Sequence, residues 1–212
     1  MEYIKQLVGL FLHVDKNLNL LVQSLGIYSY VVLFLVIFME TGLVVTPFLP
    51  GDSLLFAAGA LAAFGSFNIF ILFILLLLAA FLGDTVNYWI GRYIGPRAFR
   101  MNSKLLKREY LGKAQNFYDK HGGIAIVLAR FVPIVRTFAP FVAGVGKMHY
   151  GNFITYNILG GVLWTALFTF AGYFFGNILF VKANFHYVVV VIVLISVVPI
   201  VIEFVKVRRG KR

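Results

Sequence analysis

The chain has 212 residues, of which 61% are hydrophobic and only 13% are charged. About 25% of the residues of a soluble domain are charged, so the composition excludes an ordinary soluble protein and predicts several membrane spans. The net charge is +11, but the basic residues gather in a central connection, 96–121, and at the C-terminus, as in cytoplasmic segments under the positive-inside rule. We therefore expect no nucleic acid as a partner. The absence of cysteine excludes disulfides, thiolate metal sites and cysteine nucleophiles.

The predicted elements are apolar segments of helical length, separated by short polar stretches. Near the N-terminus, Leu, Val and Phe are mixed with charged side chains, which predicts an amphipathic helix in the membrane interface. We treat residues 1–212 as a single membrane domain. Its predicted parts, in chain order, are the amphipathic helix 1–25, a span at 27–45, a proline-containing segment at 46–64, a long helix at 67–93, the basic cytoplasmic loop 96–121, a second proline-containing segment at 123–146, a span at 153–176 and a C-terminal transmembrane helix at 185–205.

The first proline-containing segment places carboxylates beside a break in a helix. Glu40 lies near the end of the preceding span, and Pro50 and Asp52 lie inside the segment. Proline breaks a helix because it supplies no backbone donor. Broken backbone at hydrocarbon depth persists only where protein or a water-filled cavity covers it. The segment therefore predicts a polar site inside the membrane.

The second proline-containing segment carries arginines instead of acids. Arg130 and Arg136 lie on either side of Pro133, a spacing that suits two sides of a bend better than one face of a helix. A guanidinium group offers a planar fork of donors that matches a phosphate. Structural pairing with Glu40 or Asp52 is the competing explanation for both arginines.

The number of membrane crossings predicts how these two segments are arranged. If the basic loop and the basic C-terminus are both cytoplasmic, an even number of crossings separates them. Three apolar segments lie between them, so one must enter and leave by the same face, and the proline-broken segment 123–146 is expected to be this re-entrant hairpin. The same argument makes 46–64 a second hairpin, which enters from the opposite side, and places both termini in the cytoplasm.

Weak internal similarity indicates two repeats, residues 27–95 and 123–176. Inverted repeats are typical of secondary transporters, whose broken elements form a substrate site near the midplane. The sequence therefore predicts an all-α polytopic membrane protein with two oppositely oriented re-entrant helical hairpins in an inverted repeat. Shared use of Phe, Gly and Pro in membrane helices is the alternative explanation. The similar stretches are Phe48-Leu49-Pro50 with Gly59 and Phe131-Val132-Pro133 with Gly144, and also Gly91–Gly95 and Gly172–Gly176.

Six charged residues in or beside apolar segments need an explanation. An ionised side chain at the centre of the bilayer costs about 2.5–3.5 kcal/mol, so the six must be paired, hydrated or close to the interface. Three acids balance three arginines in this set, which comprises Glu40, Asp52, Asp84, Arg92, Arg130 and Arg136.

The acids differ in what their sequence neighbours predict. Glu40 follows a purely apolar run, and because burial disfavours a charged carboxylate, we expect Glu40 to exchange protons. Asp52 follows Pro50-Gly51, which predicts that it caps a helix, takes part in the polar site, or does both. Asp84 and Arg92 lie near a helix end, which predicts a local salt bridge or a snorkelling anchor.

Signatures of enzymes, metals and cofactors are absent from the sequence. There is no nucleophile elbow, no phosphate-binding glycine loop and no histidine pair of a zinc protease, and the four histidines show no ligand spacing. We therefore expect neither an enzyme nor a bound metal or cofactor. Trp89, Trp164 and Tyr173 are expected in aromatic belts or helix contacts, and Gly160-Gly161 in turns or close helix packing.

Four stretches of the chain match a known family in their order and spacing. They are Glu40-Thr41-Gly42, Phe48-Leu49-Pro50-Gly51-Asp52-Ser53, Gly83-Asp84-Thr85-Val86-Asn87-Tyr88 and 129–140. The chain thereby resembles the DedA family of bacterial inner-membrane proteins, including the subgroup of YqjA and YghB, which is related to the VTT, or SNARE-associated Golgi protein, domain. The resemblance implies a role in membrane-lipid homeostasis, dependence on the proton-motive force and translocation of lipid carriers. It also implies that Glu40, Asp52, Arg130 and Arg136 are functional positions.

These observations predict a proton-motive-force-dependent transporter or flippase of anionic lipid phosphate, either undecaprenyl phosphate or a phospholipid, in the bacterial inner membrane. Glu40 and Asp52 are the expected proton-coupling residues, and Arg130 and Arg136 the expected phosphate-binding residues. Membrane lipids and protons are the expected partners, and a homo-oligomer is left open. The alternatives are a proton-coupled transporter of a small ion or solute, such as a cation/proton antiporter, and a non-transporting membrane scaffold. The expected supporting positions are Asp84, Arg92, Pro50 and Pro133.

Overall fold

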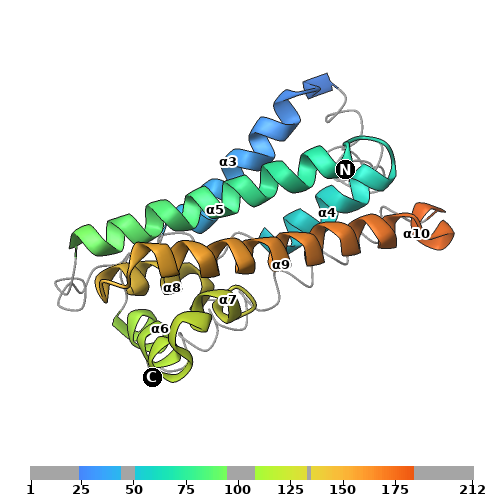
Figure 1. Cartoon of the computed structure of the whole chain (residues 1–212). Coiled ribbons are helices and arrows are strands. Elements are labelled where there is room, and N and C mark those ends of the chain that lie inside the picture. Colours follow the sequence, from blue (N-terminus) through green and yellow to red (C-terminus); the bar gives the residue numbers. More distant parts are fainter. Residues whose placement is uncertain (1–23, 44–50, 95–107, 133–134, 184–212) are drawn as a thin grey trace, which may run out of the picture. The chain divides into compact units, whose positions relative to one another are not determined.

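The computed structural model describes residues 24–43, 51–94, 108–132 and 135–183. The amphipathic helix predicted at 1–25 falls almost wholly outside these residues, and the span predicted at 185–205 falls outside them altogether. Every regular element within the described residues is a helix (Figure 1). In chain order they are α3 (Tyr28–Gly42), α4 (Gly51–Ala63), α5 (Ile69–Ile94), α6 (Arg108–His121), the short 3₁₀ helix η2 (Gly122–Ile124), α7 (Ala125–Ala129), α8 (Val135–Val145), α9 (Tyr150–Gly176) and α10 (Leu179–Ala183).

Among the described helices, α5 and α9 are long and apolar enough to cross a membrane. Their 26 and 27 residues correspond to about 40 Å of helix, more than the roughly 30 Å of a hydrocarbon core. The spans predicted at 67–93 and 153–176 agree with these helices to within three residues. The basic connection predicted at 96–121 contains a helix at its end, α6, which its polar composition did not indicate.

The chain divides into two compact units. Unit 1 joins Met1–Tyr30, Pro50–Leu72 and Phe168–Arg212, and unit 2 joins Val31–Leu49 and Phe73–Leu167. Each unit therefore combines elements from both halves of the sequence, so the units do not coincide with the two predicted repeats.

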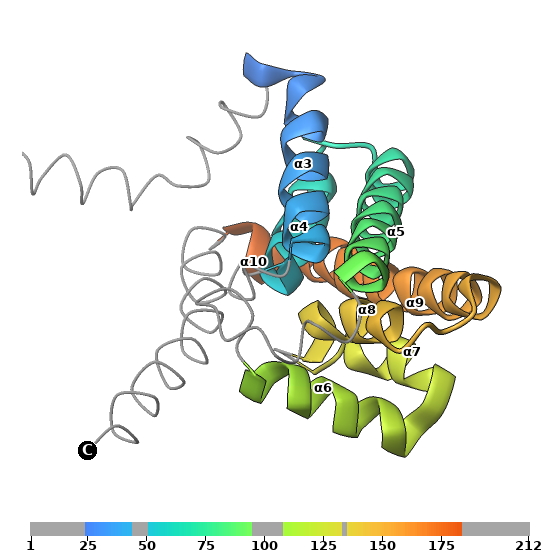
Figure 2. The same ribbon diagram turned by 90° about the vertical axis from the view of Figure 1, so that its left-hand side faces the viewer.

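Unit 2 is built around α8, which is buried on nearly all sides. Val135 and every residue from Thr137 to Val145 are buried. Helix α8 packs against α6 and α7 and lies between α6 and α5 (Figure 2). Burial on nearly all sides places α8 in the protein interior, and its 11 residues make only about 16 Å. Helix α8 is therefore too short to cross a membrane by itself.

In unit 1, α4 packs closely on the last part of α9 through a pair of glycines. A Cβ atom on Gly59 of α4 would overlap the carbonyl oxygen of Thr169 in α9. A Cβ atom on Gly172 of α9 would overlap the carbonyl oxygen of Phe56 in α4. Small residues of this kind allow the backbones of membrane helices to approach closely.

The same contact recurs in unit 2 between α8 and α5. A Cβ atom on Gly144 of α8 would overlap the carbonyl oxygen of Tyr88 in α5, and one on Gly91 of α5 would overlap that of Phe141 in α8. In both units, each glycine lies three positions after the residue whose carbonyl faces the other glycine. The two packing arrangements therefore correspond residue by residue.

Helices α4 and α8 also end in the same way. Each is followed by a residue with a left-handed backbone, Gly65 with φ +82° and Lys147 with φ +55°. In each, the next backbone N–H, of Ser66 or Met148, donates to a carbonyl five residues earlier. This is the hydrogen-bond pattern of a Schellman cap. The likeness of the two short helices thus extends beyond their glycine contacts.

We predict that Gly144→Ala lowers the free energy of unfolding by about 1–3 kcal/mol, because its methyl group has no space beside α5. Gly112→Ala on α6 is the matched control, since a Cβ atom there meets nothing within 4 Å, and it should leave stability unchanged or raise it by up to about 1 kcal/mol. Unfolding of both purified variants in detergent, followed by tryptophan fluorescence, measures the difference. Identical transitions would show that the α5–α8 contact is not close-packed.

Candidate functional site

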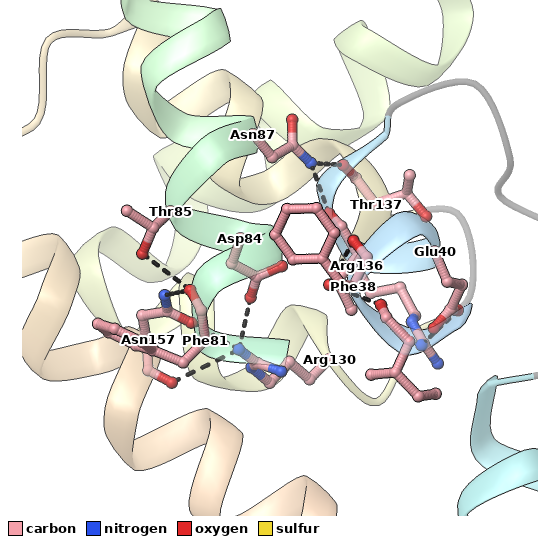
Figure 3. A network of polar contacts seen from close by, with 12 residues as sticks. Phe38, Glu40, Phe81, Asp84, Thr85, Asn87, Arg130, Arg136, Thr137 and Asn157 are labelled. Carbon is pink, nitrogen blue, oxygen red and sulfur yellow. Dashed lines mark hydrogen bonds and ion pairs between the residues drawn. The ribbon is translucent and has the colours of Figure 1, made fainter. Parts of the chain in front are cut away.

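One ion pair of the site joins α3 to α8. Glu40 lies in the last turn of α3, and Arg136 is the second residue of α8. The Nη2 group of Arg136 donates to Oε1 of Glu40 at 2.5 Å (Figure 3). The two side chains are only 13% and 4% exposed. The pair therefore forms in the interior, between residues 96 positions apart in the sequence.

A second ion pair joins α5 to the turn that follows α7. The Nη2 group of Arg130 donates to Oδ2 of Asp84 at 2.5 Å and to Oδ1 of Asn157 at 2.5 Å. The charged side chains of this pair are each 6% exposed. Asn157, on α9, donates in turn from Nδ2 to the carbonyl oxygen of Phe81 at 3.2 Å. Arg130 is thereby held by both α5 and α9.

The indole ring of Trp164 faces both guanidinium groups. The Cζ atom of Arg136 lies 4.6 Å from the ring centroid, and that of Arg130 lies 5.9 Å from it. Trp164 is buried, and a desolvated cation over an indole gains about 2 kcal/mol. The ring therefore helps to hold two like charges near each other.

The two ion pairs share one small cavity. Its volume is about 10 Å³, which is about the room that one water molecule needs. The two carboxylates and two guanidinium groups, when all are ionised, carry no net charge. The cavity is lined by Glu40, Thr41, Asp84, Arg130, Arg136, Thr137 and Trp164.

Three residues without charge position the elements around this cavity. Asn87 of α5 donates from Nδ2 to the carbonyl oxygens of Thr41 at 3.1 Å and Thr137 at 2.8 Å, which fixes the last turn of α3 and the first turn of α8. A Cβ atom on Gly83 of α5 would overlap the hydroxyl of Thr41, and one on Gly160 of α9 would lie 3.1 Å from Cδ of Arg130. Glycine at these positions leaves room for α3 and for the arginine side chain.

The structure thus brings together Glu40, Arg130 and Arg136, and it adds Asp84 as the carboxylate beside Arg130. Asp52 lies in the first turn of α4, within unit 1. Pro50 and Pro133, expected as supporting positions, lie outside the described residues.

Arg92 lies apart from the cavity lining, at the end of α5. It is exposed, donates from Nη1 to the hydroxyl of Tyr88 at 2.7 Å and lies over the ring of Trp89, with Cζ 5.6 Å from the centroid. Of the two explanations weighed for Arg92, this geometry fits the anchor, while Asp84 pairs with Arg130 rather than with a neighbour on its own helix.

Sequence reasoning assigned no part in the site to Asn157 and placed Trp164 among belts or helix contacts. Their positions, together with Gly160 and Gly161, follow the spacing i, i+3, i+4, i+7, which is one face of a helix. A lone polar residue on the same face as a glycine pair and a tryptophan was the signal that could have identified them.

We predict that Asn157→Ala destabilises the protein by about 1.5–3 kcal/mol, the range for a hydrogen bond to a charged group. Asn177→Ala is the matched control, because the exposed side chain of Asn177 donates to the carbonyl oxygen of Tyr173 rather than to a buried group, and surface changes of this kind stay within about 0.5 kcal/mol. Unfolding in detergent compares the two. An equal, small effect at both positions would contradict the placement of Asn157 beside Arg130.

Comparison with known proteins identifies the family. The VTT domain matches residues 49–174. Protein DedA of Escherichia coli K12 is 53% identical over 99% of this chain and 97% of its own length. An uncharacterized membrane protein of Mycobacterium tuberculosis is 42% identical over 88% of this chain and 85% of its own length. Inner membrane protein YqjA of Escherichia coli K12 is 36% identical over 70% of this chain and 68% of its own length.

No solved structure matches the chain. The domain match covers more than half of the sequence, and the similarity to DedA extends over nearly all of it. The chain therefore belongs to the DedA family of membrane proteins, which is defined by the VTT domain.

Proposed function

We propose that this protein is a proton-coupled transporter, or flippase, of lipids with anionic phosphate headgroups in the bacterial inner membrane. The observation that carries the proposal is the pair of buried guanidinium groups, each held by one carboxylate and both facing Trp164. Charged side chains are rare within membrane segments and mark pathways for substrates and ions. Two adjacent guanidinium groups offer the donor geometry that phosphate oxygens accept.

Binding of a phosphate requires the arginines to exchange partners. The cavity has room for about one water molecule, so a headgroup can bind only when a carboxylate releases its guanidinium group. Protonation of the carboxyl removes the charge that forms the ion pair. Glu40 is positioned for this exchange through its bond to Arg136, and we retain Asp52 as a second proton-coupling residue because it falls on the family motif.

We further propose that α4 and α8 belong to two re-entrant hairpins in an inverted repeat, with both termini in the cytoplasm. Three observations support this arrangement. The helices have only 13 and 11 residues, they pack through corresponding glycine contacts, and they end in the same cap. Inverted repeats place their broken elements near the membrane midplane, so Arg136, at the start of α8, would lie where substrate crosses.

A second candidate function is proton-coupled transport of a small ion. The size of the cavity favours it, because a water-sized species fits there without rearrangement. Arg136→Lys separates the two functions, since lysine keeps the charge but loses the planar fork. Transport of lipid phosphate should fall sharply in this variant, whereas transport of a small ion that needs only the charge should persist.

We predict that Glu40→Gln and Arg130→Ala each reduce lipid-phosphate movement in proteoliposomes at least about tenfold. Glutamine cannot take up and release the proton, and alanine removes a charged donor to phosphate, whose hydrogen bonds contribute about 1.5–3 kcal/mol. The assay follows a fluorescent short-chain lipid phosphate from one leaflet to the other. Lys120→Ala is the control, because Lys120 is an exposed cation at the end of α6, and it should transport like the wild type.

Unchanged transport in both variants would rule out these roles. A non-transporting scaffold predicts a different result, in which both variants lose membrane insertion and even the wild-type protein moves no lipid.

A further inference from the structure

The site contains equal numbers of buried positive and negative groups. Arg130 and Arg136 face Glu40 and Asp84 around one cavity, and none of the four side chains is more than 13% exposed. An uncompensated charge in such a place is far less stable than a paired one. The total charge of the site must therefore stay close to zero, whatever occupies it.

Asp84 pairs with Arg130 in the same way as Glu40 pairs with Arg136. Each carboxylate accepts from Nη2 of its arginine at 2.5 Å, and each lies on a different element from that arginine (Figure 3). The charged groups that act on the Asp84 carboxylate are Arg130 and Arg136, and Glu40 also acts on Arg130. The four groups therefore form one electrostatic unit.

Arg130 keeps a second anchor that does not depend on the charge of Asp84. The amide oxygen of Asn157 accepts from the same Nη2 group at 2.5 Å, and the ring of Trp164 lies 5.9 Å from Cζ. An amide and an indole do not titrate. If Asp84 is neutralised, Arg130 is still oriented and can accept another anion as its partner.

We infer that Asp84 is a further proton-exchanging carboxylate, the partner of Glu40 in the cavity lining, and that phosphate crosses this site electroneutrally, with one proton entering for each negative charge of the headgroup. The inference rests on the proposed function and adds a residue and a stoichiometry to it. A proton from water adds to a carboxylate oxygen of Glu40 or Asp84 as the phosphate takes over the guanidinium group. The proton returns to water on the other side when the phosphate leaves and the ion pair forms again.

The charge of the headgroup then sets the number of protons. A phosphodiester carries one negative charge and needs one protonated carboxyl. A phosphomonoester carries about 1.5–2 negative charges at pH 7, and its dianion needs a proton on both Glu40 and Asp84. The site has two carboxylates beside its two arginines, and two is the number of proton-accepting groups that the dianion requires.

Transport in proteoliposomes tests whether the number of protons matches the charge of the headgroup. The probes are fluorescent short-chain phosphatidic acid, a monoester, and phosphatidylglycerol, a diester, with the membrane potential set by valinomycin and potassium. The wild-type protein should take up about two protons per monoester dianion and about one per diester, as the charges require. A potential of about 100 mV should change lipid distribution less than about twofold, whereas one uncompensated charge would shift it about 50-fold.

Asp84→Asn tests the residue itself. Asparagine cannot take up the proton, so the number of protons taken up per monoester should fall from about two to about one. Asp84→Glu should restore the wild-type number. Asp119→Asn on α6 is the matched control, because Asp119 is exposed and bonds to Gln115, and its ratio should equal that of the wild type. If Asp84→Asn does not insert, the wild-type protein still tests electroneutral exchange, through the number of protons taken up per lipid and the effect of the membrane potential on lipid distribution.

The possible failures are distinguishable. If the wild-type protein moves neither probe, the proposed function itself is wrong. If it moves them but the distribution follows the potential, or if Asp84→Asn keeps the wild-type ratio, lipid transport stands and the electroneutral exchange through Asp84 is overturned.

Discussion

Burial of two guanidinium groups away from water is the constraint on which the rest of the structure depends. Removing such an ion from water costs several kcal/mol, which is recovered only if a counter-charge and further hydrogen bonds are in place. Arg136 finds its partner 96 positions away on α3, and Arg130 finds its partner 46 positions away on α5. The ion pairs therefore form only when α3 meets α8 and α5 meets the turn after α7, and they fix the relation of these elements within unit 2.

Close packing of the helix backbones brings the elements that carry the charged groups near enough to pair. Glycines let α3 and α8 lie directly against α5, at Gly83 and Gly91, on either side of Asp84. Larger side chains there would push α3 and α8 away from α5, on which Asp84 lies. The recurrence of the α5–α8 contact between α4 and α9 indicates that the same packing solution serves both units, although the two described ion pairs belong to unit 2.

The sequence was most informative about features whose free energy depends on a residue and its neighbours in the sequence. The long apolar helices α5 and α9 were predicted to within three residues. The cost of burying charge singled out six residues, and four of them line the cavity: Glu40, Asp84, Arg130 and Arg136. The pairing of Asp84 was not predictable in this way, because its partner comes from another helix and sequence proximity suggested Arg92 instead. Helix α6 was not recognised because its stabilising contacts are with α7 and α8, and polar composition alone resembles that of a loop.

A double-mutant cycle on Glu40 and Arg136 tests the central claim, that the charged groups form ion pairs across helices in the interior. Glu40→Gln, Arg136→Gln and the double variant are compared with the wild type by unfolding in detergent. A direct pair predicts a coupling free energy of about 1–3 kcal/mol, within the range for residues in contact. Effects that add to within about 0.5 kcal/mol, as for distant and independent sites, would contradict it.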